Sequence, residues 1–130
     1  MQRSNAAPRV FIADDSALIR DRVAAMLGEC AFTVTGFGAT PQACIAGILA
    51  QRPDVVVLDV QLEGGTGLEV LRAVRAQLPS VAFVVFSNSS GPAYRKRYLA
   101  HGAIGFLDKS KDFEQLPRAV TAAFGRRAAH

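Results

Sequence analysis

Four consecutive apolar residues end in a carboxylate at Val55-Val56-Val57-Leu58-Asp59. A continuous apolar run of this kind is typical of a strand that is covered on both faces, as in a parallel sheet. A charge inside such a run costs several kcal/mol unless it is paired or exposed at the end of the strand. We therefore expect Asp59 to end a buried strand and to be a functional residue, the alternative being a turn or loop aspartate.

Two other apolar runs also end in charged residues. They are Val10-Phe11-Ile12-Ala13 before Asp14-Asp15, and Ile104-Gly105-Phe106-Leu107 before Asp108-Lys109. If the three runs are parallel strands, their carboxyl ends share one edge of the sheet, where ligands bind in open α/β folds. Clustered carboxylates with an opposed lysine suit a hard divalent cation and a phosphoryl group.

The hydrophobic pattern alternates between short apolar runs and helical segments. Strands are predicted over residues 9–13, 32–37, 54–58, 81–86 and 104–107. Helix start signals follow the strands at Ser16, Thr40-Pro41, Thr66 with Glu69, Gly91-Pro92, and Asp112 with Gln115. Pro117 is expected to kink the fifth helix or to delay its start. Five successive β/α pairs predict an α/β fold, with a parallel sheet and helices on both faces.

Length and composition favour one globular domain. The chain has 130 residues, half of them apolar, and a formal net charge of +4. We assign residues 1–8 to a disordered N-terminal tail, 9–125 to the domain and 126–130 to a C-terminal tail, which leaves no room for an output domain. No signal-peptide or membrane-spanning run is present, and Cys30 and Cys44 match no zinc or CxxC spacing. A cytoplasmic protein without membrane insertion is expected.

Each candidate site residue also has an ordinary structural interpretation. Asp14 and Asp15 are either an acidic helix cap or Mg²⁺ ligands. Lys109 is either a solvated residue or a contact for a phosphoryl group. Ser87 is either a turn residue or a hydrogen-bond donor to a phosphoryl oxygen. The joint pattern favours the functional interpretation, because four of the five predicted strands end with a suitable polar group.

Taken together, these motifs resemble the receiver domains of two-component response regulators. The resemblance extends from Arg9 to about Phe124 and includes Gly67-Leu68-Glu69 and the segment 102–106. It implies a flavodoxin-like, doubly wound sheet of five parallel strands in the order 2-1-3-4-5, with five helices. The functional roles that it implies are Asp59 as phosphoacceptor; Asp14, Asp15, Asp59 and the Gln61 carbonyl as Mg²⁺ ligands; Ser87 and Phe106 as switch residues; and Lys109 as phosphate-binding lysine.

The function implied is that of a stand-alone, single-domain response regulator. A histidine kinase or histidine phosphotransfer protein would donate the phosphoryl group, and phosphorylation would change the affinity for a downstream protein that the sequence does not identify. Such a chain is a self-modifying signalling domain and not a turnover enzyme. Gln61 argues against an aspartyl-nucleophile phosphatase, which needs an acid at that position. The alternative is a phosphorylation-independent, receiver-like adaptor.

Four residues depart from the usual family pattern. Ser110 replaces the proline after the lysine, so the Lys109–Ser110 bond is either trans or a strained cis bond. Glu63 replaces another proline and precedes two glycines, which predicts a more flexible loop. Ser87 replaces the commoner threonine, and Phe106 lacks a hydroxyl group. These changes affect the expected switching more than the expected phosphorylation.

The predicted fourth helix carries the basic and aromatic segment Tyr94-Arg95-Lys96-Arg97-Tyr98. Tyr94 and Tyr98 are one turn apart and are expected to share a face. This face is either a solvated basic surface or a partner-binding surface formed by Tyr94, Arg95 and Tyr98. No recognition motif for nucleic acid is present, so direct nucleic-acid binding is not expected.

Overall fold

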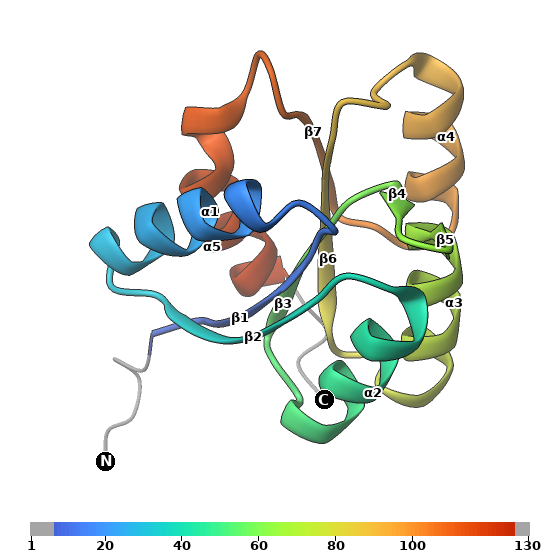
Figure 1. Ribbon diagram of the computed structural model, residues 1–130, viewed down its shortest axis with the longest axis horizontal. Coiled ribbons are helices and arrows are strands. Elements are labelled where there is room, and N and C mark those ends of the chain that lie inside the picture. Colours follow the sequence, from blue (N-terminus) through green and yellow to red (C-terminus); the bar gives the residue numbers. More distant parts are fainter. Residues whose placement is uncertain (1–6, 127–130) are drawn as a thin grey trace.

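The computed structural model describes residues 7–126, which form a five-stranded parallel sheet with helices on both faces (Figure 1). The sheet strands are β1 (Arg9–Ala13), β2 (Thr33–Gly38), β3 (Val55–Leu58), β6 (Ala82–Ser87) and β7 (Gly105–Asp108). Their order is β2-β1-β3-β6-β7, which confirms the predicted order 2-1-3-4-5 when these five strands are counted along the chain. Residues 1–6 and 127–130, on which most of the predicted tails fall, lie outside the described residues.

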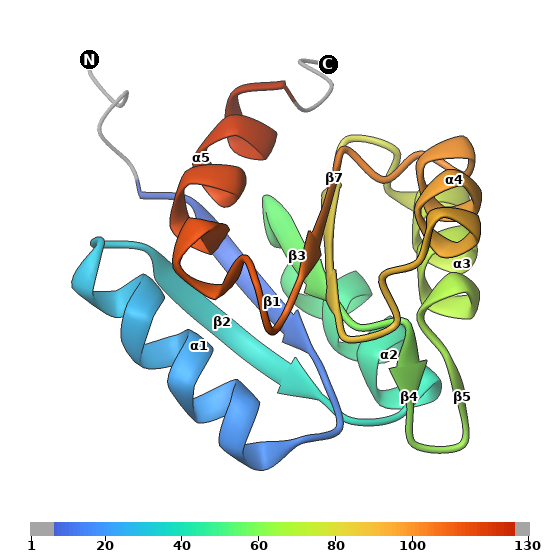
Figure 2. The same cartoon turned by 90° about the horizontal axis from the view of Figure 1, so that it is seen from above.

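The helices form two layers, one on each side of the sheet. They are α1 (Ala17–Glu29), α2 (Pro41–Gln51), α3 (Gly67–Gln77), α4 (Pro92–Ala100) and α5 (Leu116–Arg126). Helices α1 and α5 cover one face, and α2, α3 and α4 cover the other (Figures 1 and 2). Within residues 7–126, no helix has the length and apolar character needed to cross a membrane.

Alternate residues of the three central strands, β1, β3 and β6, enter separate cores on the two sides of the sheet. In β1, Phe11 and Ala13 belong to the core beneath α2, α3 and α4. Val10 and Ile12 belong to the core beneath α1 and α5. All four side chains are buried. Burial on both faces explains why the central strands are continuous apolar runs and do not alternate with polar residues.

The strand register brings the charged residues to one edge. Ala13 at the end of β1 is paired with Leu58 at the end of β3. Asp14 and Asp59 therefore leave neighbouring strands at the same level. Lys109 directly follows β7 and reaches the same carboxyl edge. This placement confirms that the three runs are parallel strands whose ends converge.

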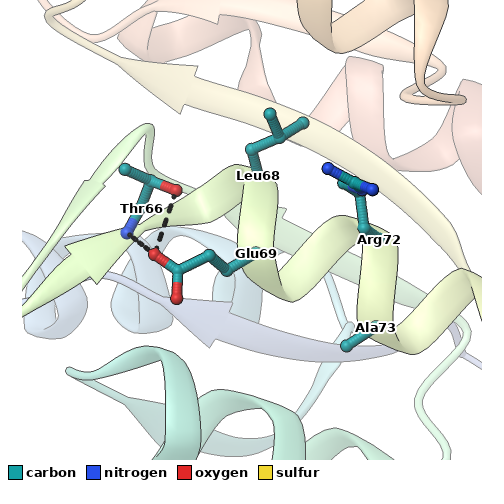
Figure 3. Close-up of a pocket in the computed structure, with 5 residues that line it drawn as sticks. All are labelled: Thr66, Leu68, Glu69, Arg72 and Ala73. Carbon is teal, nitrogen blue, oxygen red and sulfur yellow. Dashed lines mark hydrogen bonds between the residues drawn. The ribbon is translucent and has the colours of Figure 1, made fainter.

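The predicted helix start signals are present in the structure. The side-chain oxygens of Ser16 and Thr40 each accept a hydrogen bond from the N–H group three residues later, at 3.2 and 3.1 Å. The Glu69 carboxylate accepts a hydrogen bond of 3.0 Å from the Thr66 N–H (Figure 3). These contacts satisfy N–H groups that have no partner within the helix.

Helix α5 begins later than its first start signal. A 3-10 turn at Phe113–Gln115 precedes Leu116, the first residue of α5. Pro117 is the second residue of that helix, where its missing N–H removes no helical hydrogen bond. Of the two outcomes expected for Pro117, the delayed start is the one observed.

A small hairpin after β3 was not predicted. Strands β4 (Gln61–Leu62) and β5 (Gly65–Thr66) pair in antiparallel fashion. Gly64 has φ +78° at the turn, a conformation that favours glycine. The Glu63 N–H donates a hydrogen bond of 3.0 Å to the Ala39 carbonyl, which fastens the hairpin to the start of α2. Two paired residues per strand are too few to give a hydrophobic period that sequence analysis could detect.

Helix α4 is exposed along most of its length, and Tyr98 is its one buried residue. Tyr98 is 2 % exposed, whereas Tyr94 is 40 % exposed. The expectation that Tyr98 shares an exposed face with Tyr94, whether a solvated surface or a partner-binding surface, is therefore wrong for Tyr98. A helix has about 3.6 residues per turn, so a residue four positions later lies about 40° further around the helix axis than one full turn. This offset places Tyr98 on the side of α4 nearer the core than Tyr94. Tyr94 and Arg95 remain exposed.

Candidate functional site

Lys109 forms ion pairs with two carboxylates at the carboxyl edge of the sheet. Its Nζ lies 2.6 Å from Asp14 Oδ2 and 2.8 Å from Asp59 Oδ2. The three residues follow β1, β3 and β7, so the fold assembles them from distant parts of the chain. Their side chains are at most 9 % exposed. Shielding from water strengthens the attraction between these charges, while the cost of removing them from water opposes it.

Asp14 is a buried carboxylate with two stabilising contacts. Burial raises its pKa, and the hydrogen bonds from Lys109 and the Ser16 N–H oppose that effect without cancelling it. The Ser16 N–H donates to Asp14 Oδ1 at 2.9 Å. The contact ties the carboxylate to the N-cap of α1, so the same turn starts the helix and orients a site residue.

Asp59 is held by its backbone as well as by Lys109. Its N–H donates a hydrogen bond of 2.9 Å to the Ala13 carbonyl, which continues the pairing of β1 with β3. A Cβ atom at Gly67 would lie 2.1 Å from the Asp59 carbonyl oxygen, far inside contact distance. Gly67 is therefore required by the close approach of α3 to the residue that we expect to be the phosphoacceptor.

The pKa of Lys109 reflects two opposing effects. Burial alone would lower it, but the hydrogen bonds and charges of Asp14 and Asp59 together outweigh burial and raise it. The ammonium group is therefore charged at neutral pH. It is a fixed positive charge beside the Asp59 carboxylate.

Three carboxylates of the site could together hold a metal ion. Oxygen atoms of Asp14, Asp15 and Asp59 all lie within 4.8 Å of one another. These are the hard oxygen donors that Mg²⁺ prefers. Three ionised carboxylates and one ammonium group leave a formal charge of −3 + 1 = −2. A divalent cation would balance it. Asp15 is exposed, which would leave one side open to a phosphoryl group.

Gln61 lies next to this cluster. Its N–H is 3.4 Å from Asp59 Oδ1, at the long end of the range for a hydrogen bond. Gln61 also begins the β4–β5 hairpin, opposite Thr66. The hairpin thus holds the Gln61 backbone near Asp59, and the role of its carbonyl as a metal ligand stays a prediction.

The two predicted switch residues are buried. The Ser87 hydroxyl accepts a hydrogen bond of 3.0 Å from the Ser89 N–H. Phe106 contacts Tyr98 edge to face, with ring centroids 6.3 Å apart. Arg95 donates a hydrogen bond of 3.1 Å to the Phe106 carbonyl and lies over its ring. The Phe106 ring therefore points into the core.

The loop after β7 has no cis bond. Every peptide bond among residues 7–126 is trans, including Lys109–Ser110, so the trans alternative holds. The loop is instead organised by the Asp108 carboxylate, which accepts hydrogen bonds from Ser110, Lys111 and Ser90. In the sequence, Asp108 stands out only as an acid beside Lys109. The available signal was an aspartate two residues before a serine, a typical turn-forming arrangement.

A separate depression lies on the surface of α3 and has a volume of about 470 Å³. It is lined by Thr66, Leu68, Glu69, Arg72 and Ala73 (Figure 3). Figure 3 shows Glu69 turned back toward Thr66, so its carboxylate serves the start of the helix. None of these residues belongs to the Asp59 cluster, which is the chemically organised site of the domain.

The fold and this cluster define a parallel α/β domain with an acidic, lysine-balanced pocket at its carboxyl edge. The chain belongs to the family of response regulator receiver domains, which it matches over residues 10–121. Receiver domains are signalling domains that interact with histidine kinases or phosphotransfer proteins and bind Mg²⁺ at an acidic pocket.

Individual relatives agree with this assignment. Response regulator GacA of Pseudomonas aeruginosa is 27 % identical over 117 residues, covering 89 % of this chain and 55 % of GacA. Protein-glutamate methylesterase/protein-glutamine glutaminase 1 of Anaeromyxobacter dehalogenans is 34 % identical over 107 residues, covering 81 % of this chain and 30 % of that protein. The chain thus spans about half the length of GacA.

Solved structures share the fold. A two-component response regulator of the LuxR family from Aurantimonas sp. SI85-9A1 superposes with a TM-score of 0.88 at 26 % identity, covering 95 % of this chain and 89 % of that one. The response regulator domain of Thermotoga maritima CheB gives 0.84 at 23 % identity, covering 94 % and 99 %. The second likeness concerns the fold alone.

Proposed function

We propose that Asp59 accepts a phosphoryl group from a histidine kinase or a histidine phosphotransfer protein and that phosphorylation changes the affinity of this domain for a partner. The observation that carries the proposal is the position of the Asp59 carboxylate. It is 7 % exposed, lies 2.8 Å from the Lys109 ammonium and shares a possible metal site with Asp14 and Asp15.

The proposed reaction is a displacement at phosphorus. An Asp59 carboxylate oxygen forms a P–O bond as the P–N bond of the donor phosphohistidine breaks. The electron pair of the broken bond stays on the imidazole nitrogen, and Asp59 becomes an acyl phosphate. Such a transfer needs little covalent help from the protein and depends mainly on positioning and on compensation of charge.

The chain supplies both requirements. Lys109 would contact an oxygen of the transferred group, exchanging part of its ion pair with Asp59 for that contact. Asp14, Asp15, Asp59 and the Gln61 carbonyl would hold Mg²⁺, which would neutralise negative charge on the phosphoryl oxygens. The ion pairs keep the Asp59 carboxylate in place before the donor arrives.

Ser87 and Phe106 are the proposed switch. The Ser87 hydroxyl would turn away from the Ser89 N–H and donate a hydrogen bond to a phosphoryl oxygen. Phosphorylation would thus favour one of two arrangements of the loop that joins β6 to α4. Tyr94 and Arg95 are exposed beside that loop and are the residues that we propose for partner contact.

The mass of the intact protein after incubation with acetyl phosphate and Mg²⁺ tests the proposal. We expect one phosphoryl adduct in the wild type and in Asp21→Asn, a control at an exposed position on α1, and none in Asp59→Asn. An adduct that persists in Asp59→Asn would exclude Asp59 as the acceptor. A folded wild type that no donor or kinase labels would favour the phosphorylation-independent adaptor.

Stand-alone organisation and a cytoplasmic location are further parts of the proposal. The mass of the endogenous protein tests the first, and cell fractionation tests the second. Binding to a fluorescent oligonucleotide at physiological salt tests the expected lack of nucleic-acid affinity.

A further inference from the structure

Lys109 stands in a loop that has no proline to restrict it. A lysine side chain has a flexible four-carbon stem, so the position of its ammonium group depends on where the backbone holds its Cα atom. The bond to Ser110 is trans. Other contacts must therefore fix this loop if Lys109 is to remain between Asp14 and Asp59.

The Asp108 carboxylate provides these contacts. Its Oδ1 accepts hydrogen bonds from the N–H groups of Ser110, at 2.7 Å, and Lys111, at 3.0 Å. The backbone of Asp108 also exchanges two hydrogen bonds with Asp112, whose N–H donates to its carbonyl and whose carboxylate accepts from its N–H. Hydrogen bonds between Asp108 and residues 110–112 thus hold together the turn that contains Lys109.

The same carboxylate joins this turn to the loop after β6. Its Oδ2 accepts a hydrogen bond from the Ser90 hydroxyl. The Ser110 hydroxyl donates a hydrogen bond of 3.0 Å to the side-chain oxygen of Asn88. The Lys109 N–H donates a hydrogen bond of 3.1 Å to the Ser87 carbonyl. Three hydrogen bonds therefore connect the Lys109 loop to the loop that carries Ser87.

We propose that Asp108 is a positioning residue for phosphoryl transfer: it holds Lys109 beside Asp59 and links the Lys109 loop to the Ser87 loop. Asp108 does not touch the site itself; its effect passes through Lys109. The proposal rests on the proposed function, because it concerns the rate at which Asp59 is phosphorylated. The hydrogen bonds from Ser90 and from the backbone also lower the pKa of Asp108, so it is a charged acceptor at neutral pH.

Two substitutions of Asp108 distinguish the effect of its hydrogen-bond acceptor from the effect of its negative charge. Asp108→Ala removes the acceptor for both backbone N–H groups. Asp108→Asn removes the charge but keeps a side-chain oxygen that can accept from Ser110 and Lys111. Asp21→Ala makes the same chemical change as Asp108→Ala at an exposed position on α1 and is the matched control.

The rate constant for adduct formation with acetyl phosphate and Mg²⁺ is the first measurement. We expect Asp108→Ala to be slower than the wild type by about tenfold to a hundredfold, as for other small misplacements of a reacting group. The rate constants of Asp108→Asn and Asp21→Ala should stay within about threefold of the wild-type value. A wild-type rate in Asp108→Ala, or an equally slow Asp108→Asn, would overturn the proposal.

A double-mutant cycle distinguishes positioning from a general structural effect. If Asp108 acts through Lys109, Asp108→Ala should cause no further loss of rate in a Lys109→Ala background. If the double variant instead loses rate by the product of the two single-variant factors, Asp108 does not act through Lys109. If Asp108→Ala does not fold, Asp108→Glu replaces it in the cycle, because the extra methylene displaces the carboxylate from the two N–H groups.

A second readout needs no phosphodonor. The ammonium group of Lys109 is held by two carboxylates, so we expect its ¹H–¹⁵N NMR signal in the wild type and in Asp108→Asn but not in Asp108→Ala. A signal that persists in Asp108→Ala would overturn the positioning role. A wild type that forms no adduct would contradict the proposed function instead, and the ammonium signal would still decide the role of Asp108.

Discussion

Tyr98 provides a quantitative prediction for the alkaline stability of this domain. Burial raises the pKa of its hydroxyl from 10.0 to about 12. The unfolded chain therefore releases the Tyr98 proton at lower pH than the folded chain does. The stability that this difference contributes is fully present below pH 10.0 and is lost as the pH rises toward about 12.

The size of the loss follows from the two pKa values. Each pKa unit corresponds to about 1.4 kcal/mol, so ionisation of Tyr98 should destabilise the fold by about 1.4 kcal/mol at pH 11. With a urea m-value of about 1–3 kcal/mol/M, the unfolding midpoint should move by roughly 1 M. Tyr98→Phe has no ionisable hydroxyl and should lack this part of the decrease.

The assay is urea unfolding, followed by circular dichroism, of the wild type and Tyr98→Phe from pH 8 to 11. The difference between the two proteins isolates Tyr98, because all other titrating groups are common to both. Tyr94→Phe, at a residue that is 40 % exposed, is the control and should follow the wild type. Parallel pH profiles for the wild type and Tyr98→Phe would refute the argument that Tyr98 is buried as a neutral phenol.

Three further substitutions test the packing and the site. Tyr98→Ala should cost about 3–5 kcal/mol of unfolding free energy, because it empties the space of a buried aromatic ring, and a loss under 1 kcal/mol by urea titration would contradict the assigned burial. Gly67→Ala should lower both the melting temperature and the phosphorylation rate, since its Cβ would lie 2.1 Å from the Asp59 carbonyl oxygen; wild-type values in both assays would show that α3 can move aside. Lys109→Ala should retain Mg²⁺ binding by calorimetry, because it removes a positive charge from the acidic cluster, but should slow adduct formation on Asp59; an unchanged rate would remove Lys109 from the proposed reaction.

The parts of the fold that could be predicted are those with a local signal. The run Val55–Leu58 is apolar because β3 is covered on both faces, and this property is visible in four adjacent residues. The N-caps at Ser16 and Thr40 act on N–H groups only three residues away. The bounds of β1 match the predicted strand, whereas each of the other four sheet strands differs from its predicted range by one residue at one or both ends. Neighbouring strands, and not the apolar run itself, determine where pairing starts and stops.

The parts that could not be predicted depend on contacts between distant residues. Tyr98 carries the same chemical signal as Tyr94, and only the position of α4 against the sheet places one in the core and the other in solvent. Asp108 and Ser90 are 18 positions apart in sequence, and their hydrogen bond exists because β6 and β7 are neighbours. A pattern of neighbouring residues does not indicate which distant residues will contact each other.

The sequence by itself determined the order of the five sheet strands and the five α-helices along the chain, and the acidic and basic residues at the strand ends. Periodicity, capping and burial of charge are local properties, so they can be predicted from neighbouring residues. Only the tertiary structure decided that Lys109 lies within 2.8 Å of both Asp14 and Asp59. The reason is physical: parallel strands are joined through crossover helices, and an ion pair between them forms only when the whole sheet has assembled.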